Sequence, residues 1–145
     1  MIALRQASAQ DLDKVSELLS DARLPLEGVS DCIDEFIVAE SDGSLIGSVG
    51  IERYGEFALL RSAAVSPDYR RKGIGRKLID AIVARAEAQG VKAIYLLTTT
   101  AESYFPEFGF TTVDRSWVPS ELTASREFQD ACPSSATVMR KNLRS

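Results

Sequence analysis

The chain has 145 residues, 45% of them hydrophobic and 26% charged, and carries a formal net charge of −4. This length suits a single domain, residues 1–145, with a sizeable core, and the negative charge argues against general nucleic-acid binding. No apolar stretch approaches the roughly 20 residues of a membrane span and the start of the chain lacks a signal-peptide pattern, so we expect a soluble cytoplasmic protein without membrane contact.

Hydrophobic periodicity and turn-forming residues predict alternating strands and helices. In the first half we expect a strand over residues 2–7, a helix over 11–21 capped by Ser8, a hairpin of strands over 36–40 and 45–53, and a strand over 57–65. In the second half we expect a helix over 74–88, a strand over 93–100, a short helix over 102–108, a strand over 110–115, a helix over 119–131 and a strand over 136–143. Early hairpins and a crossover helix predict an α/β chain with a mixed sheet and helices on both faces.

The absence of histidine and the spacing of the cysteines narrow the kinds of catalytic and metal site that the chain can form. The chain has no histidine, which excludes histidine-based triads and histidine-ligated metals. Cys32 and Cys132 lie a hundred residues apart and match no metal-binding spacing, so we expect idle thiols and no metal site. Proton transfer must then use carboxylates, tyrosines, thiols or water.

A basic glycine turn, R-R-K-G-I-G over residues 70–75, separates the strand over 57–65 from the helix over 74–88. The first turn of a helix offers free N–H groups and the positive end of the dipole, and glycine lets a bulky phosphate approach the backbone. Five basic residues fall within eight positions: Arg70, Arg71, Lys72, Arg76 and Lys77. The turn fits neither the Walker loop nor the Rossmann fingerprint, but its context predicts a site for a phosphate-bearing ligand.

The stretch from residue 59 to 99 resembles the acetyl-CoA-binding core of the GNAT (Gcn5-related) N-acetyltransferase superfamily. The residues that carry the resemblance are Arg70, Gly73 and Gly75 of the signature [RQ]-x-x-G-x-[GA], and Ala64, Val65 and Pro67 of the preceding strand end. Downstream, FPEFGF over residues 105–110 is similar to the family segment Y-E-K-L-G-F. The resemblance implies a GNAT fold, in which a central, mostly antiparallel sheet has a splayed fourth and fifth strand pair.

The resemblance also implies that acetyl-CoA is the cosubstrate. In the family the main chain after the fourth strand cradles the pyrophosphate, the strand itself pairs with the pantetheine arm, and an N–H group near Val65 polarises the thioester carbonyl. Carried over by position, the cofactor-binding candidates are Ala63, Ala64, Val65, Arg70, Arg71, Lys72, Gly73, Ile74, Gly75, Arg76, Thr98 and Phe105.

Two of these positions depart from the family pattern. Thr98 stands where the family often has asparagine, and Phe105 stands where it often has the tyrosine that protonates the departing thiolate. Tyr104 is next to Phe105, but adjacent helical residues point about 100° apart, which leaves its role as the acid open. A CoA thiol has a pKa of about 8.5, so the thiolate can also leave without a protein acid.

The acceptor amine must lose a proton before it attacks, and Glu52 and Glu56 are the leading candidates for the base. They flank the turn that enters the strand over 57–65, in the region of the family's acceptor site. The alternative is that both are solvated turn residues.

The acceptor itself is expected to meet four side chains. Arg61 lies inside an apolar strand, and strict alternation puts it on the same face as Ala63 and Val65, so we expect it to bind an acidic group of the acceptor. The alternative for Arg61 is a salt bridge at a sheet edge. The weaker candidates are Arg53, Thr99, which also suits a strand by propensity alone, and Trp117, for which core packing is the alternative.

A narrower resemblance comes from LLRSAAV, LLTTTAESYFPEFGF, the helix start WVP and CPSSA. These segments look like the small GNAT proteins of arsenic-resistance operons, which are similar to the acetyltransferase domain of N-acetylglutamate synthase. The resemblance implies direct transfer of an acetyl group to a small primary amine, an amino acid or an amino-acid-like compound. Two alternatives stay open: a protein N-terminal or lysine acetyltransferase, and a non-catalytic acyl-CoA-binding module. Small GNAT proteins are often dimers, so a homodimer also stays open.

Overall fold

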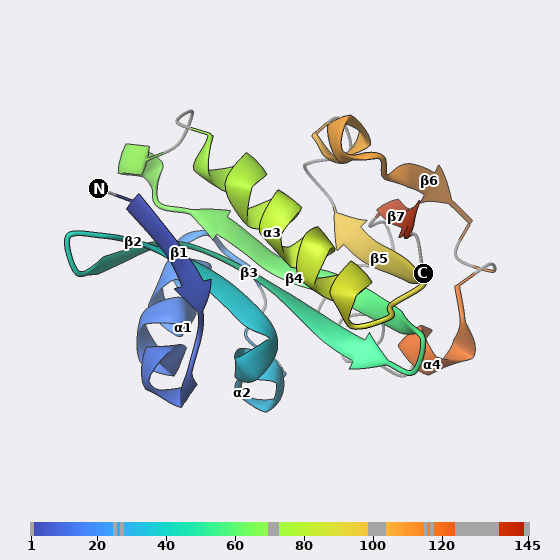
Figure 1. The fold of residues 1–145 in the computed structure, drawn as a ribbon, viewed down its shortest axis with the longest axis horizontal. Coiled ribbons are helices and arrows are strands. Elements are labelled where there is room, and N and C mark those ends of the chain that lie inside the picture. The colour runs from blue at the N-terminus through green and yellow to red at the C-terminus, as the bar shows by residue number, and fades with distance from the viewer. Residues whose placement is uncertain are drawn as a thin grey trace.

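The computed structural model describes residues 2–24, 26, 28–69, 73–98, 104–114, 116, 118–123 and 137–143. These residues form a seven-stranded sheet with the strand order β1-β2-β3-β4-β5-β7-β6. Neighbouring strands are antiparallel except for the parallel pair β4–β5. The mixed sheet with helices on both faces confirms the fold class expected from the sequence (Figure 1).

The first half of the chain follows the predicted order of elements. It contains β1 (Ile2–Gln6), the 3-10 turn η1 (Ala9–Asp11), α1 (Leu12–Asp21), β2 (Phe36–Ser41), β3 (Ser44–Tyr54) and β4 (Phe57–Val65). The structure adds a helix and a 3-10 turn that we did not predict, α2 (Val29–Cys32) and η2 (Ile33–Glu35). A helix of four residues is too short to display an apolar period, so the sequence carries no signal for it.

The second half also keeps the predicted order. It contains η3 (Pro67–Tyr69), α3 (Ile74–Ala88), β5 (Ala93–Thr98), the 3-10 turn η4 (Phe105–Phe108), β6 (Thr111–Val113), α4 (Ser120–Thr123) and β7 (Thr137–Asn142). The predicted helix over residues 119–131 is described only through α4, and its remainder lies outside the described residues.

Helix α3 forms because its apolar residues recur at helical spacing and its ends are capped by glycines. Gly90, with φ of +83°, follows the last turn, and the N–H of Val91 donates to the carbonyl of Ala86 at 3.0 Å. The buried face of α3 consists of Ile74, Leu78, Ile79, Ile82 and Ala86. This face covers one side of the sheet and builds the largest core cluster.

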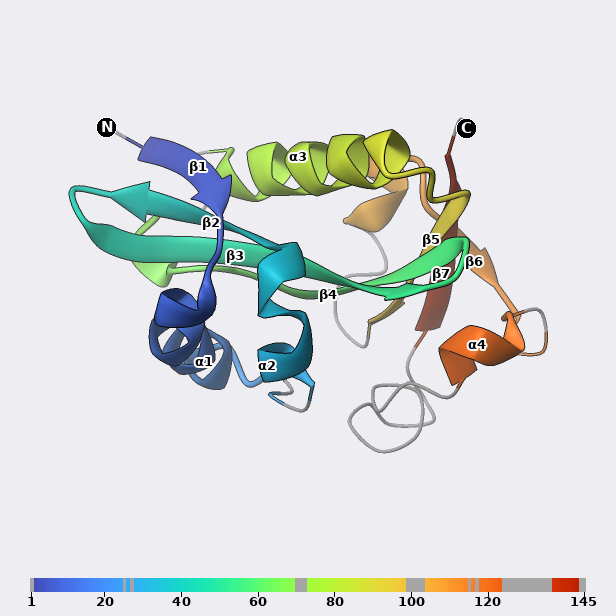
Figure 2. The same ribbon diagram turned by 60° about the horizontal axis from the view of Figure 1, so that its bottom comes forward.

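The other side of the sheet is covered by α1, α2 and α4 (Figure 2). Val15 and Leu19 of α1 pack with Phe36 and Val38 of β2. Leu122 of α4 belongs to a separate cluster with residues of β4, β5 and β7. The two faces of β4 therefore meet different surroundings, α3 on one side and the shorter helices on the other.

Strands β4 and β5 separate after a short paired segment. They pair only over Phe57, Ala58 and Leu59 on β4 and Ala93, Ile94 and Tyr95 on β5. β4 then continues to Val65 and β5 to Thr98 without further pairing between them. The splayed strand pair that the family resemblance implied is thus present, and it opens the sheet beside the start of α3.

A buried carboxylate joins β1 to the start of α1. Asp11, 7% exposed, accepts two hydrogen bonds of 2.8 Å from the guanidinium of Arg5 and one of 2.8 Å from the N–H of Ser8. These bonds hold the pKa of Asp11 well below its ordinary value of 3.8, with the hydrogen bond from Arg5 as the largest cause. We expected Ser8 to cap this helix; the Asp11 side chain caps the Ser8 N–H in turn, as in a capping box.

Replacing Asp11 by asparagine is expected to lower the free energy of unfolding by about 1–3 kcal/mol, because it weakens the bonds to Arg5 and Ser8. The native pKa of Asp11 is depressed, so its contribution is fully present above its unfolded value and is lost as the pH falls below about 4. Urea unfolding of wild type and Asp11→Asn between pH 3 and 7 measures this. Glu17→Gln, an exposed position of α1, is the control. Equal stability of both variants at pH 7 would contradict the role of Asp11.

Candidate functional site

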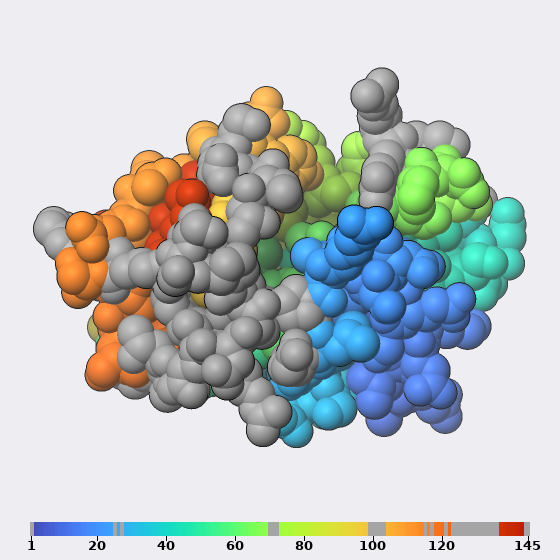
Figure 3. All heavy atoms as spheres, turned by 180° about the vertical axis from the view of Figure 1, so that it is seen from behind, coloured from blue at the N-terminus to red at the C-terminus, as the bar shows by residue number. Residues whose placement is uncertain are grey.

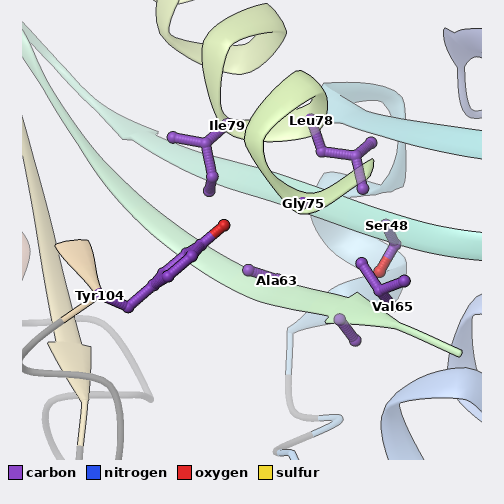
Figure 4. Close-up of a pocket in the computed structure, with 8 residues that line it drawn as sticks. Ser48, Ala63, Val65, Gly75, Leu78, Ile79 and Tyr104 are labelled. Atoms are coloured by element: carbon purple, nitrogen blue, oxygen red, sulfur yellow. The ribbon is translucent and has the colours of Figure 1, made fainter. Parts of the chain in front are cut away.

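A pocket of about 160 Å³ lies where β4 leaves β5, beside the first turns of α3. Its lining comes from β3, β4, α3 and the residue before η4: Ser48, Ala63, Ala64, Val65, Gly75, Leu78, Ile79 and Tyr104. Figure 4 shows Ala63 and Val65 on one wall and Gly75, Leu78 and Ile79 on the other. The lining is mostly apolar, so the pocket suits an extended, uncharged chain better than a charged group.

Helix α3 begins within the glycine turn for which the sequence predicts a phosphate. Gly73 precedes the helix in the left-handed region, with φ of +79°, a conformation that glycine adopts without strain. Ile74, Gly75 and Arg76 follow as the first helical residues, whose N–H groups have no partner within the helix. Arg70, Arg71 and Lys72 lie outside the described residues.

Gly75 makes room for the tyrosine of the pocket. A Cβ added at Gly75 would lie 2.9 Å from the hydroxyl oxygen of Tyr104, closer than such contacts normally allow. The family signature accepts alanine at this position. In this chain alanine would displace Tyr104, so the two residues form a coupled pair.

Tyr104, and not Phe105, faces the pocket. The Tyr104 hydroxyl points toward the start of α3 in Figure 4. Phe105 is 7% exposed and packs against Phe110, with ring centroids 5.7 Å apart. The 3-10 turn begins at Phe105 and directs it into the core, which argues against its predicted contact with the cofactor. Burial raises the pKa of Tyr104 above its ordinary value of 10, so its hydroxyl keeps its proton near neutral pH.

Arg76 connects the start of α3 to η4. Its guanidinium lies 4.9 Å from the centroid of the Phe108 ring and 3.7 Å from the carboxylate of Glu107. Both side chains of the ion pair are more than half exposed, so the pair adds little to stability. Arg76 is the third residue of α3, so its positive charge lies at the helix start for which the sequence predicts a phosphate.

An extra residue in β4 reverses the side-chain alternation of that strand. Gly50 pairs with Arg61 and Ser48 pairs with Ala64, so the single β3 residue between them faces both Ser62 and Ala63. Ser62 takes up the irregularity with φ of +60°, in the left-handed region that L residues rarely adopt. The Ser48 hydroxyl donates to the Ser62 carbonyl at 2.9 Å.

This bulge corrects our prediction from strict alternation. Leu60 and Val65 both pack in the α3 cluster although they are an odd number of residues apart. Arg61 therefore lies on the face of α1 and α2, whereas Val65 faces α3. The bulge could not be predicted from the sequence, because the residue in the left-handed conformation is a serine and not a glycine.

Two candidates of the sequence analysis, Glu52 and Arg61, meet in a buried ion pair. The Arg61 side chain is 0% exposed and Glu52 is 10% exposed, and Arg61 Nη1 donates to Glu52 Oε2. Arg61 Nε also donates to Ser62 Oγ at 3.0 Å, and the Tyr54 hydroxyl donates to Glu52 Oε1 at 2.5 Å. The alternative for Arg61, a salt bridge, is thus present, although it lies on the central strand β4 and not at a sheet edge.

Gly28 borders this ion pair from the side of α2. A Cβ at Gly28 would lie 3.1 Å from Arg61 Nη1 and 3.2 Å from Glu52 Oε2. Gly28 also has φ of +81°, which any other residue would adopt with strain. Gly28 and Tyr54 could not be predicted as neighbours of the ion pair, because a glycine in a loop and a tyrosine at a strand end are ordinary there.

The remaining candidates lie elsewhere. Glu56 is exposed, forms an ion pair of 3.1 Å with Lys92, and lies seven residues before Ala63 on β4, about 23 Å along the strand. That distance argues against Glu56 as the base. Arg53 is exposed and its side chain alternates away from Glu52. Thr98 ends β5 opposite Thr137 of β7. Thr99 and Trp117 lie outside the described residues.

Two further properties concern only the part of the chain that the structure describes. There, no three His, Cys, Asp or Glu side chains gather as metal ligands would. Among the same residues, no helix combines the length and the apolar character needed to cross a membrane.

Comparison with known proteins identifies relatives over most of the chain. Residues 3–110 match the family described as Acetyltransferase (GNAT) family. The amino-acid acetyltransferase of Ectopseudomonas mendocina (strain ymp) is 32% identical over 139 residues, 88% of this chain and 32% of the relative. That of Escherichia coli (strain K12) is 30% identical over 138 residues, 87% of this chain and 30% of the relative. The chain thus spans about a third of the length of these relatives.

Solved structures share the fold at lower identity. N-acetylglutamate synthase from Neisseria gonorrhoeae, complexed with coenzyme A and N-acetyl-glutamate, has a TM-score of 0.85 at 23% identity and covers 100% of this chain and 36% of its own. Rv2747 from Mycobacterium tuberculosis, in complex with CoA, has a TM-score of 0.82 at 20% identity and covers 98% of this chain and 99% of its own. At these identities the likeness establishes the fold alone.

Replacing Ser48 by alanine is expected to lower the free energy of unfolding by about 1–3 kcal/mol, because it leaves the carbonyl of Ser62 without its hydroxyl donor in a buried site. Ser48 is 0% exposed, so water cannot replace that donor from bulk solvent. Urea unfolding measures the loss, with Ser44→Ala, an exposed position of the same strand, as control. If both variants unfold at the wild-type denaturant concentration, Ser48 does not hold the bulge.

Proposed function

The chain belongs to the acetyltransferase (GNAT) family, and on this basis we propose that it moves the acetyl group of acetyl-CoA to the primary amine of an amino acid or an amino-acid-like compound. The transfer is direct, within a ternary complex of protein, acetyl-CoA and amine. The observation that carries the proposal is the apolar pocket between the splayed end of β4 and the glycine-led first turn of α3.

Two parts of acetyl-CoA, the pantetheine arm and the pyrophosphate, match two neighbouring parts of this site. The pantetheine arm is extended and amide-bearing, so it can lie along residues 63–65 like an added strand. The pyrophosphate then reaches the N–H groups at the start of α3, with charge from Arg71, Lys72 and Arg76. The family match and the fold shared with CoA-bound structures support this binding mode.

The reaction needs one proton removed and one returned. The amine nitrogen attacks the thioester carbonyl, a C–N bond forms, and the C–S bond breaks to release the CoA thiolate. Glu52 takes the amine proton directly or through water, and the backbone near Val65 stabilises the oxyanion. Tyr104 keeps its proton near neutral pH and lies in the pocket, so it can return a proton to the thiolate.

The proposal that the acceptor is an amino acid rests on the proteins to which this chain is similar. The amino-acid acetyltransferases that match this chain are named for amino-acid substrates. The narrower resemblance to small acetyltransferases of arsenic-resistance operons also points to an amino-acid-like amine. A protein N-terminus or lysine side chain is the competing acceptor.

Release of free CoA thiol from acetyl-CoA, measured across amino acids, simple amines, polyamines and peptides, tests this function. Thiol release that depends on an amino acid, with the N-acetylated product identified by mass spectrometry, is the expected result. Release with peptides alone would instead support a protein acetyltransferase. Intact binding of acetyl-CoA by calorimetry without thiol release for any amine would contradict the proposal.

The double variant Arg71→Ala/Arg76→Ala is expected to weaken acetyl-CoA binding by at least tenfold, because two cations near the phosphates are lost. Calorimetry at low and high salt measures this, and the wild type should lose affinity more steeply with salt than the variant. Arg85→Gln, near the far end of α3, is the matched control. Wild-type affinity in the double variant would disprove the phosphate site.

Tyr104→Phe is expected to lower kcat by about tenfold or less, since a thiolate leaves readily even without an acid. The KM for acetyl-CoA should change little, because the ring that lines the pocket remains. Steady-state kinetics measure both constants, and Tyr95→Phe, in the core on the other face, controls for loss of a phenol. An unchanged kcat from pH 6 to 9 would exclude Tyr104 as the proton donor.

A further inference from the structure

We propose that Arg61 and Ser62 are positioning residues for the acetyl-CoA site. The Arg61 guanidinium holds Ser62 in the left-handed conformation, and that conformation decides which main-chain groups of β4 face the opening beside β5. The inference rests on the proposed function, because it concerns the strand segment along which the pantetheine arm would lie. Neither side chain has to touch acetyl-CoA or the amine to play this role.

The pairing of β4 with β3 decides which main-chain groups face the opening. The N–H of Ser66 donates to the carbonyl of Ile46 at 2.7 Å, so the main-chain groups of Ser66 point toward β3. Because these groups alternate along a strand, those of Ala64 also point toward β3, whereas those of Ala63 and Val65 point toward the other edge of β4. That edge is the one from which β5 separates after a short paired segment.

The bulge at Ser62 sets this alternation, because β4 contains one more residue there than β3 does. With the bulge, Ser48 pairs with Ala64. A regular ladder continued from the preceding residues would put Ala63 opposite Ser48 instead. The main-chain groups of Ala64 would then face the opening, and those of Ala63 would bond to β3.

Ser62 is held on two sides in a conformation that serine rarely adopts. Its φ is +60°, which is strained for an L residue and persists only where the surroundings stabilise it. Arg61 Nε donates to Ser62 Oγ at 3.0 Å, and the Ser48 hydroxyl donates to the Ser62 carbonyl at 2.9 Å. Ser62 is buried, so water competes little for these hydrogen bonds. The side chain of Arg61 therefore stabilises the bulge from the face opposite to the acetyl-CoA pocket.

Arg61 can hold Ser62 because Arg61 is itself fixed. Its buried side chain donates to the carboxylate of Glu52, which also accepts from the Tyr54 hydroxyl. The backbone at Gly28 lies so close that an added Cβ would be 3.1 Å from Arg61 Nη1. In Figure 3, which shows the molecule from the side opposite to α3, blue atoms of the N-terminal segment lie over part of this face. The enclosed ion pair thus holds the guanidinium, and the guanidinium holds Ser62.

Two ligands, one with and one without the pantetheine arm, test this role. CoA contains the arm, whereas adenosine 3′,5′-bisphosphate is the nucleotide part without it, so the ratio of their affinities reports on contacts with β4. In Ser62→Ala, which removes Oγ and keeps a Cβ, the affinity for CoA should fall about fivefold to tenfold, while that for the bisphosphate stays the same. Calorimetry measures both affinities, and Ser44→Ala, at an exposed position of β3, is the control.

A glycine variant separates the backbone conformation from the serine side chain. Ser62→Gly also lacks Oγ, but glycine adopts a φ of +60° without strain, so its affinity for CoA should stay within about twofold of the wild-type value. Arg61→Lys keeps a positive charge beside Glu52 and loses the Nε donor, so it should weaken CoA binding as Ser62→Ala does. The double variant Arg61→Lys/Ser62→Gly should regain the affinity that Arg61→Lys loses. Arg53→Lys, exposed on β3, is the control, and the Ser62 variants test the bulge with both buried charges still paired.

The outcomes separate this inference from the proposed function. If Ser62→Ala is folded by circular dichroism and has the wild-type ratio of affinities, the inference is wrong, although the acetyltransferase function stands. If Ser62→Gly does not restore the CoA affinity that Arg61→Lys loses, Arg61 does not act through Ser62 and the inference is also wrong. If the affinities follow the expected order but no amine causes thiol release, the function is wrong and the positioning role stands. If the wild type binds no CoA, both are wrong.

Discussion

The bulge in β4 is the constraint on which the candidate site depends. One additional residue, absorbed by Ser62 in the left-handed region, turns Arg61 toward α2 and Val65 toward α3. Without it, strict alternation would put Arg61 and Val65 on the same face. The strand would then carry a buried charge into an apolar pocket lined by Leu78 and Ile79.

The separation of β4 from β5 leaves an opening next to the bulge. Paired strands leave no room between them, whereas these two diverge after Leu59 and Tyr95. The opening lies beside the start of α3, where a left-handed glycine exposes the first N–H groups of the helix. An apolar pocket, a helix start with exposed N–H groups and a buried ion pair thus lie around residues 61–65 of β4. Each is ordinary alone, and their convergence is what supports acetyl transfer.

Much of this fold could be predicted from the sequence, because periodicity and turn residues report local structure. The bounds of β4 and α3 were predicted to the residue, since apolar spacing and the glycines mark both. The glycine turn and the splayed strand pair followed from the resemblance of that segment to a known family. Helix α2 could not be predicted, because four residues cannot establish a helical period.

The geometry of the site was less predictable, because it depends on contacts between distant residues. Glu52 was selected as a candidate base beside a turn and Arg61 as a charge inside an apolar strand, but their ion pair depends on the register of β3 with β4. The role of Tyr104 was left open by an argument from helical angles, whereas the structure has a 3-10 turn there that begins one residue later. Gly28 matters only because it borders two charged groups from elsewhere in the chain. No local pattern encodes such a contact.

In the proposed function the cosubstrate and the acceptor lie on opposite faces of β4, and amide NMR shifts test this arrangement most directly. With ¹⁵N-labelled protein, CoA should shift the amides of residues 63–65 and 74–79, and a bound amino acid added afterwards should shift those of Glu52, Tyr54 and Arg61. If CoA instead shifts the amides of Glu52, Tyr54 and Arg61 and leaves those of residues 63–65 and 74–79 unchanged, the proposed placement of acetyl-CoA is wrong.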